Sequence, residues 1–337
     1  MRIKRTALLL LSSSLAVFLL LAGFVSPHGP TTQYRETPYA PPTRLHFLDA
    51  TGFNLRPFVY LLVPDGEGFR EDLARPNPVH LFVRGSEYQL LGILNSNIHL
   101  FGVNEPARIF LLGTDGFGRD VFSRLLYGGQ ISLTAGILAT LLTLATATII
   151  GTISGYYGRW VDEFLMGSAE LFLSLPWLYF LFGVRAFLPL HLGPEATFLL
   201  LVSVIGLIGW ARPARLIRGV VLSARARNYV LAARGFGGSD LYVLRRHILP
   251  ETLGVLFTQA ALLVPQYVAA EATLSFFGLG INEPVPSWGN MLSTLQQYNV
   301  LISYSWLLAP VGALIVTSVT FWLLADALHY WLKSPSS

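Results

Sequence analysis

The residues of this chain that could carry chemistry are few and widely spaced. The sequence has no cysteine, which excludes disulfides, thiolate metal sites and thiol nucleophiles. Lysine occurs only at Lys4 and Lys333, and neither follows the glycine-rich turn that a nucleotide-binding P-loop requires. The histidines lie without metal-ligand spacing, at His28, His46, His80, His99, His191, His247 and His329. The sequence therefore predicts no metal site and no nucleotide site, and any ATP-driven step must use another chain.

A glycine-rich segment, residues 113–120 with the sequence GTDGFGRD, could be mistaken for a phosphate-binding or calcium-binding loop. It lacks the lysine of a P-loop and the terminal glutamate of an EF-hand. We instead expect an Asx-type turn that caps the apolar helix that follows it.

Two carboxylates stand out for their position in apolar sequence. Glu271 lies within an apolar stretch, where a carboxylate is costly and often functional, and Ser275 and Phe276 follow on the same stretch. These three residues are candidates either for lining a pathway or for packing, and both roles remain open. Asp326 is expected near the end of a helix, as a helix-end or partner contact.

The most informative segment, residues 228–250, contains no catalytic residue types and reads NYVLAARGFGGSDLYVLRRHILP. We expect a helix that stops at Gly235, Gly237 or Gly238, because glycine tolerates the left-handed conformation that closes a helix. A structured loop of this kind is suited to binding a partner protein.

A second short helix is expected directly after this glycine cluster. Ser239 is a good N-cap, and Asp240 complements the positive end of a helix. Pro250 should stop or bend that helix. Two short helices held at an angle would form a compact knob.

The composition that surrounds these residues is that of a membrane protein. Hydrophobic residues make up 53% of the chain and charged residues 12%, whereas soluble domains carry about a quarter charged residues. The net charge is +4, but the basic residues lie beside apolar stretches. Membrane topology explains that placement better than nucleic-acid binding does.

An apolar helix needs about 20 residues to cross the hydrocarbon core, and the sequence predicts six such spans. They are residues 6–25, 131–156, 163–188, 196–210, 252–279 and 301–331. The first has the basic start of a signal peptide, but its apolar stretch is long and no clear cleavage site follows, so we expect residues 1–25 to be a retained anchor. The short fourth span should continue as helix through Pro213.

Some residues within the expected spans have consequences for helix packing. Pro176, Pro265 and Pro310 lie inside spans, where neighbouring helices can satisfy the freed carbonyls. Gly151 and Gly155 form a GxxxG pair that would allow two helices to approach closely.

The distribution of arginine predicts the orientation in the membrane. The loop 212–251 is rich in arginine, whereas the loops 190–195 and 280–300 contain no lysine or arginine. Because basic loops stay inside, we expect the loop 212–251 and both termini in the cytoplasm of a multi-pass protein of the inner (plasma) membrane.

This topology places residues 26–130 outside the cell membrane, and their length predicts a small folded insertion. Residues 58–63 and 79–83 are rich in β-branched and aromatic side chains and are bounded by turn residues, so we expect the insertion to be partly β. The expected domains are the anchor 1–25, the extracytoplasmic insertion 26–130 and the transmembrane domain 131–333.

Three separated motifs resemble a known family. Residues 228–250 contain Ala232, Ala233 and Gly237 in the pattern AAxxxG, followed by ILP at 248–250. This pattern resembles the EAA loop in permease subunits of bacterial ABC importers.

Residues 112–133 and 271–292 agree, since they resemble two further segments of the dipeptide/oligopeptide/nickel group of that family. The order and spacing of the three motifs fit the oligopeptide/dipeptide permease C type, and the resemblance runs from residue 110 to the end of the chain. It implies an all-α membrane protein with the six-helix fold of type I ABC importer permeases, with the insertion between helices 1 and 2.

The resemblance also implies roles and partners. The loop 228–250 would dock on an ATPase subunit, and the expected coupling residues are Asn228, Tyr229, Ala232, Ala233, Arg234, Gly235, Gly237 and Asp240. The chain departs from the family at Asn228 and Leu231, where an acid is common, so a specific ion pair at those positions is in doubt. The implied partners are a second permease, two ATPase subunits that bind ATP and Mg, an extracytoplasmic solute-binding protein and membrane lipid, with no cofactor on this chain and no nucleic acid.

Two other classes of protein are disfavoured by the sequence. A self-sufficient channel or secondary transporter would need its own coupling groups, but intramembrane charges are few and no inverted repeat is visible. An intramembrane enzyme would need a constellation such as HExxH, which is absent. The solute stays open among peptides, nickel and oligosaccharides.

Overall fold

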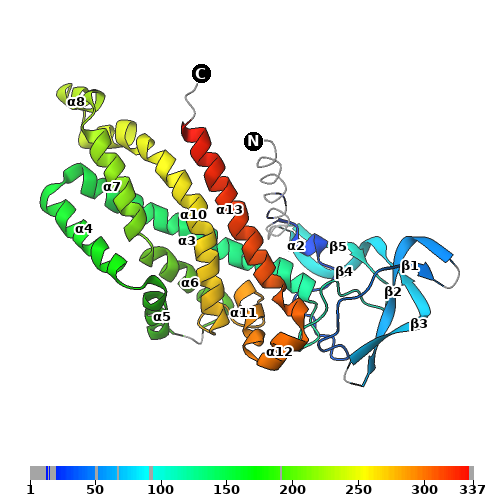
Figure 1. Cartoon of the computed structure of the whole chain (residues 1–337). Helices are drawn as coiled ribbons and strands as arrows, with labels where there is room; N and C mark the ends of the chain where they lie inside the picture. The colour runs from blue at the N-terminus through cyan, green and yellow to red at the C-terminus, as the bar shows by residue number, and fades with distance from the viewer. Residues whose placement is uncertain are drawn as a thin grey trace. The chain divides into compact units, whose positions relative to one another are not determined.

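The computed structural model describes residues 13, 15, 20–49, 52–66, 68–90, 94–189 and 192–333 of the chain (Figure 1). The described chain divides into two compact units. We refer to residues 135–271 and 317–333 as the helical unit, and to residues 20–134 and 272–316 as the mixed unit. The expected anchor lies almost wholly outside the described residues, and only its end is seen as helix α2 (Ala22–Val25).

The helical unit contains long apolar helices and a cluster of short ones. Its helices, of which α3, α10 and α13 also contribute residues to the mixed unit, are α3 (Val121–Tyr157), α4 (Arg159–Ser174), α5 (Trp177–Phe187), α6 (Pro194–Ile208), α7 (Ala211–Arg225), α8 (Asn228–Gly235), α9 (Asp240–Val243), a π-helical turn (Leu244–Ile248), α10 (Leu249–Phe276) and α13 (Ala309–Lys333).

Several of these helices are long and apolar enough to cross a membrane. Among the described residues, single candidates are Val121–Tyr157, Asp240–Phe276 and Ser305–Leu328. Two bent pairs, α4 with α5 and α6 with α7, bring the number of candidate spans to as many as five. The five spans expected after residue 130 therefore all have helical counterparts, two of them bent.

The break between α4 and α5 was not expected, since residues 163–188 read as one span. The two helices are bent by 93°. Leu175 adopts an extended conformation with ψ of 137°, and α5 starts directly after Pro176. The proline ring disfavours helical geometry in the residue before it, which explains the break.

Two other spans also differ from their expected form. The fourth does not run straight through Pro213: α6 and α7 are bent by 46°, and Pro213 lies in the first turn of α7, where its missing N–H is not needed. The last span was expected from residue 301, but α13 begins at Ala309, so Pro310 occupies its first turn rather than its interior. Pro265, by contrast, lies inside α10 as expected.

The GxxxG pair marks a close contact between α3 and α7. A Cβ atom added at Gly151 would lie 2.5 Å from the carbonyl oxygen of Ala214. One added at Gly155 would lie 2.9 Å from that of Arg218. These two glycines therefore let the backbone of α7 approach α3 more closely than larger residues would.

The mixed unit contains two small antiparallel sheets and short helices. Its strands are β1 (His46–Asp49), β2 (Gly52–Asp65), β3 (Gly68–Pro78), β4 (His80–Leu90) and β5 (Leu94–Gly102). The first three form one sheet in the order β1-β2-β3, and β4 and β5 form a hairpin. Residues 58–63 fall within β2, and the predicted strand 79–83 overlaps the start of β4, which begins at His80.

The short helices of the mixed unit follow α10 in the chain. They are α11 (Trp288–Ser293), a 3-10 turn (Thr294–Gln296), α12 (Tyr298–Ser303) and a second 3-10 turn (Ser305–Leu308). Trp288 is fully buried, and its indole N–H donates to the carbonyl of Leu125 at 3.0 Å. Ser287 and Asn290 form a capping box that starts α11.

The expected Asx-type turn before α3 is confirmed. The Oδ1 atom of Asp115 accepts hydrogen bonds from the backbone N–H groups of Phe117 at 2.9 Å and Arg119 at 3.0 Å. Asp120 caps α3 by accepting from the N–H of Ser123 at 3.0 Å. Burial raises the pKa of Asp120 to about 7, against the opposing effect of the hydrogen bonds from Ser123.

Candidate functional site

The knob formed by α8 and α9 at the end of α7 is the candidate functional site (Figure 1). One side chain of α8, Val230, is fully buried and packs into a cluster with Val221 of α7, Val243 of α9 and Ile248. The two short helices therefore have an apolar floor of their own, which explains how helices of this length hold a defined position.

The glycine cluster ends α8 with a Schellman motif. Gly237 adopts a left-handed conformation with φ of +84°. Its N–H donates to the carbonyl of Arg234, and that of Gly238 donates to the carbonyl of Ala233, both at 2.9 Å. These two bonds satisfy carbonyls that the helix end leaves free and fix the angle at which the chain leaves α8.

The start of the next helix is as expected, but its end is not. Ser239 accepts a hydrogen bond from the N–H of Tyr242 at 3.3 Å and so caps α9. However, helix continues from Asp240 to Phe276, so Pro250 does not stop it. The π-helical turn Leu244–Ile248 precedes the proline, and its wider spacing relieves the clash between a proline ring and the carbonyl four residues earlier.

One set of contacts ties the knob to the end of α3. The hydroxyl of Tyr156 donates to a carboxylate oxygen of Asp240. The guanidinium of Arg234 lies over the Tyr156 ring, 4.6 Å from its centroid, and Arg225 donates to the Tyr156 carbonyl at 2.6 Å. Tyr156 is thus contacted by α7, α8 and α9 together.

A second set ties the knob to the first turn of α10. The Oε1 atom of Glu251 accepts from the hydroxyl of Tyr229 and from a guanidinium N–H of Arg227, both at 2.9 Å. A displacement of α8 would therefore act directly on α10 as well as on α3.

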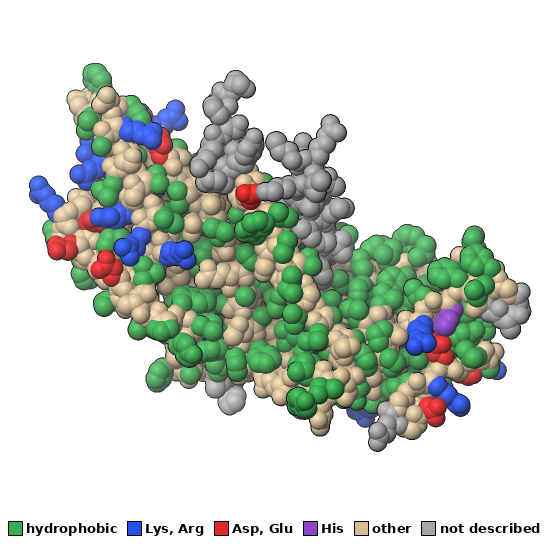
Figure 2. All heavy atoms as spheres, viewed as in Figure 1, with side chains coloured by type: hydrophobic (Ala, Val, Ile, Leu, Met, Phe, Trp, Pro, Cys, Tyr) green, Lys and Arg blue, Asp and Glu red, His purple; other side chains and the backbone are tan. Residues whose placement is uncertain are grey.

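The outer surface of the knob exposes large apolar side chains, although the segment 228–250 is rich in arginine. Phe236 is 93% exposed and Leu241 is 72% exposed, and Leu231 and Tyr242 are also exposed. Figure 2 shows basic side chains gathered over the end of the helical unit that carries α7 and α8. Exposed apolar side chains with a charged surround are typical of a protein interaction surface.

The expected coupling residues fall into two groups in the structure. Tyr229, Arg234 and Asp240 direct polar groups toward the body of the helical unit, and Gly237 shapes the turn. Ala233 belongs to the same inner group, since it is half-buried and packs against the apolar cluster that contains Val230. Those on the exposed surface are Asn228, Ala232 and Gly235. Their role in docking stays a prediction.

Of the three glycines expected to end α8, Gly238 has the least space, since an added Cβ would lie 2.7 Å from the Ala233 carbonyl oxygen, whereas Gly235 and Gly237 have nothing within 4 Å. Several other residues of the site were not singled out from the sequence. Phe236 could have been found as an apolar residue between glycines in a polar loop. The roles of Tyr156 and Glu251 depend on contacts far apart in the chain, for which the sequence has no signal.

The other candidates lie outside the knob. Glu271 is fully buried in α10. The hydroxyl of Ser275 accepts a hydrogen bond from the N–H of Ile281 at 2.9 Å, and the carbonyl of Phe276 accepts one from the Gln296 side chain. Ser275 and Phe276 thus have contacts within the mixed unit that favour packing.

A separate cluster of charges lies in the mixed unit and was not expected. Arg119 and Arg124 have side chains only 6% and 2% exposed, and both donate to the carboxylate of Glu283, at 2.6 and 2.8 Å respectively. Arg119 also pairs with Asp115 at 2.7 Å. Burial lowers the pKa of Arg119, but the carboxylates of Glu283 and Asp115 together raise it above its ordinary value.

Comparison with known proteins assigns the family. Residues 147–334 match the family described as binding-protein-dependent transport system inner membrane component. The dipeptide transport system permease protein DppC of Bacillus subtilis is 35% identical over 66% of this chain and 68% of its own length. The oligopeptide transport system permease protein OppC of Escherichia coli is 38% identical over 64% of this chain and 70% of its own.

A more distant likeness is found among solved structures. The inward-facing MetNI methionine ABC transporter has 17% identity and a TM-score of 0.45, covering 62% of this chain and 96% of that one. This likeness adds nothing to the family assignment.

The chain therefore belongs to the family of inner-membrane components of binding-protein-dependent transport systems. More specifically, it is a permease subunit of an ABC importer. It is a membrane-embedded transport subunit, and separate chains hydrolyse the ATP.

Proposed function

We propose that this chain forms half of the translocation pathway of a peptide importer, and that the knob 228–250 couples this pathway to ATPase subunits. A second permease would supply the other half, and an extracytoplasmic solute-binding protein would deliver the solute. The type I importer fold, the cytoplasmic position of the knob and both termini, and the extracytoplasmic position of residues 26–130 are parts of the same proposal.

The observation that carries the proposal is the construction of the knob. Its outer surface exposes Phe236 and Leu241, while its inner surface is bonded to α3 through Tyr156 and to α10 through Glu251. A force applied at the exposed surface would thus reach two long helices without passing through a flexible joint. Such a link can bias a membrane domain between two states.

Peptide is proposed as the solute because the relatives are named as dipeptide and oligopeptide permeases. The test is uptake by proteoliposomes that contain the chain purified together with its partners. We expect trialanine to accumulate only with ATP, and to do so faster than maltotriose or Ni²⁺. ATP-independent uptake would contradict the ABC mechanism, and preferred uptake of maltotriose or Ni²⁺ would contradict the proposed solute.

A further inference from the structure

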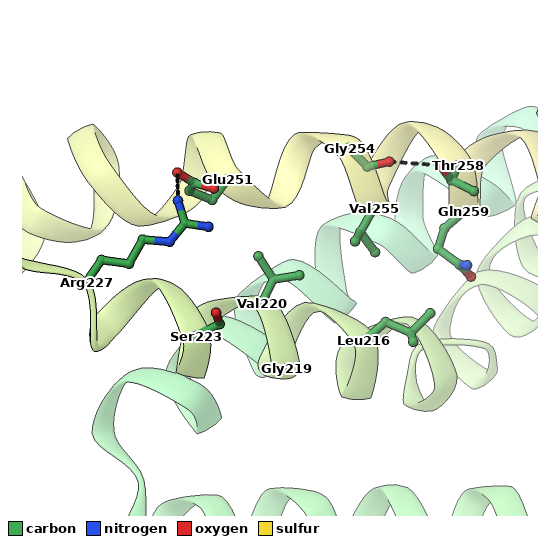
Figure 3. Close-up of a pocket in the computed structure, with 10 residues that line it drawn as sticks. All are labelled: Leu216, Gly219, Val220, Ser223, Arg227, Glu251, Gly254, Val255, Thr258 and Gln259. Atoms are coloured by element: carbon green, nitrogen blue, oxygen red, sulfur yellow. Dashed lines mark hydrogen bonds and ion pairs between the residues drawn. The ribbon is translucent and has the colours of Figure 1, made fainter. Parts of the chain in front are cut away.

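A groove runs between α7 and α10 in the helical unit, with a volume of about 650 Å³ (Figure 3). Residues of α7 and α10 line it, together with Arg227. Figure 3 shows Val220 and Ser223 pointing from α7 toward α10, and Val255 and Gln259 pointing from α10 toward α7.

Small residues keep this groove open. Gly219 has no atom within 4 Å of the position that a Cβ would occupy, so the space beside it is free. Ser223 and Gly254 are also small. Leu216, Val220 and Val255 make the groove walls mostly apolar. A mostly apolar cleft with a few polar groups is typical of a small-molecule site.

One end of the groove is joined to the knob. Arg227 and Glu251 form an ion pair of 2.9 Å there, and Glu251 also accepts from Tyr229. We take this ion pair as the inner boundary of the hydrocarbon core on α10, because an ion pair of this kind is costly within hydrocarbon.

The other end contains a polar group at membrane depth. Gln259 lies eight residues beyond Glu251, which at about 1.5 Å per helical residue is about 12 Å. Half of the hydrocarbon core is about 15 Å, so with Glu251 at the inner boundary the carboxamide would lie near the middle of the membrane. Thr258 satisfies its hydroxyl by donating to the Gly254 carbonyl at 2.9 Å. Gln259 has no side-chain hydrogen bond to another residue in the part of the chain that the structure describes.

We propose that this groove is the wall of the solute pathway on this subunit, and that the Gln259 carboxamide binds amide groups of the passing solute. A carboxamide carries two donors and an acceptor, so it matches the C=O and N–H of a peptide bond whatever the side chains are. Lipid would be a poor occupant, because an acyl chain leaves that carboxamide without a hydrogen bond in hydrocarbon. The inference rests on the proposed peptide importer and assigns its pathway to named residues.

The absence of cysteine from the natural chain permits a direct test. Single cysteines are placed at Gln259 and, as controls, at Phe257 and Leu262, which are exposed apolar residues of α10 outside the groove lining. The full complex in inside-out membranes is then treated with a charged, membrane-impermeant methanethiosulfonate. We expect the thiol at 259 to react at least about tenfold faster than either control, because a thiol in apolar surroundings has a raised pKa and little reactive thiolate.

The possible outcomes separate the occupants. Equal, slow modification at all three positions would overturn the proposal. Modification at 259 only by lipid-soluble N-ethylmaleimide would assign the groove to lipid, and disulfide formation with a cysteine on the second permease would assign it to a subunit interface. Both results would overturn the proposal.

A second variant tests whether the Gln259 carboxamide contributes to uptake. Gln259→Leu in the complex should lower the efficiency of ATP-dependent trialanine uptake about two- to tenfold, as expected for one lost hydrogen bond, with assembly and ATP hydrolysis retained. Uptake equal to that of the unaltered complex would contradict the role of Gln259 only. No ATP-dependent uptake by the unaltered complex would instead contradict the proposed function itself.

Discussion

Replacing Gly237 with valine is expected to separate ATP hydrolysis from uptake. The left-handed conformation at Gly237, with φ of +84°, costs a residue with a side chain about 1–2 kcal/mol. Such a cost lowers the ratio of native to non-native conformations of the knob about 5- to 30-fold. The ATPase would then act on a knob whose α8 and α9 are no longer held at a fixed angle.

The measurement is the ratio of trialanine taken up to ATP hydrolysed in proteoliposomes. We expect this ratio to fall for Gly237→Val, and also for Gly238→Ala, whose Cβ would lie 2.7 Å from the Ala233 carbonyl oxygen. Gly167→Val is the matched control, since Gly167 is a helical glycine of α4 with nothing within 4 Å of its Cβ position. An unchanged ratio in both knob variants would show that the geometry of this turn does not matter for coupling.

Replacing Glu283 with glutamine is expected to destabilise the mixed unit. The carboxylate of Glu283 is the shared partner of Arg119 and Arg124. Its removal leaves the two buried guanidiniums with the carboxylate of Asp115 and, for Arg124, the carbonyl of Pro30. Breaking a fully buried pair costs about 3–5 kcal/mol. Because the Glu283 side chain is 43% exposed, we expect a smaller cost, of about 2–3 kcal/mol after discounting for solvent screening.

Thermal unfolding of the purified complex, together with hydrogen exchange over residues 113–124 and 281–290, would measure this effect. Glu36→Gln is the control, because Glu36 pairs with Arg108 at 4.0 Å and is 86% exposed. We expect the control to change stability by less than about 0.5 kcal/mol. Equal behaviour of the two variants would indicate that the Glu283 carboxylate contributes no more than a surface ion pair.

The features that local sequence dictates were predictable, as the knob illustrates. Gly237 closes a helix and Ser239 starts one because their preferences act within a few residues along the chain. The Asx-type turn at Asp115 is of the same kind. In each case the sequence pattern and the backbone hydrogen bonds involve the same short segment.

The features that depend on distant residues were not predictable. Glu283 meets Arg119 across 164 residues of chain, and no periodicity connects them. Pro176 was expected to lie inside one continuous span, but it separates two helices bent by 93°. Apolar composition alone does not distinguish these two arrangements. Pro250 was expected to stop or bend the helix, because the π-helical turn that lets the helix continue through it has no simple sequence signature.

The groove shows the same limit within one helix. Gln259 is a single polar residue in an apolar stretch, and its sequence neighbours do not show which side of α10 it occupies. Only the packing of α7 beside α10, with Leu216 across from Gln259, shows that the carboxamide points into the groove (Figure 3).

The central claim is that the exposed end of the knob docks on an ATPase subunit. The most direct measurement is photo-crosslinking from p-benzoylphenylalanine placed at Phe236, in the complete complex within native membranes. The account predicts an adduct whose mass is that of this chain plus one ATPase subunit, and whose yield changes when ATP is added. An adduct with lipid or with the solute-binding protein instead, or labelling of a cysteine at position 236 from the extracytoplasmic side, would contradict it.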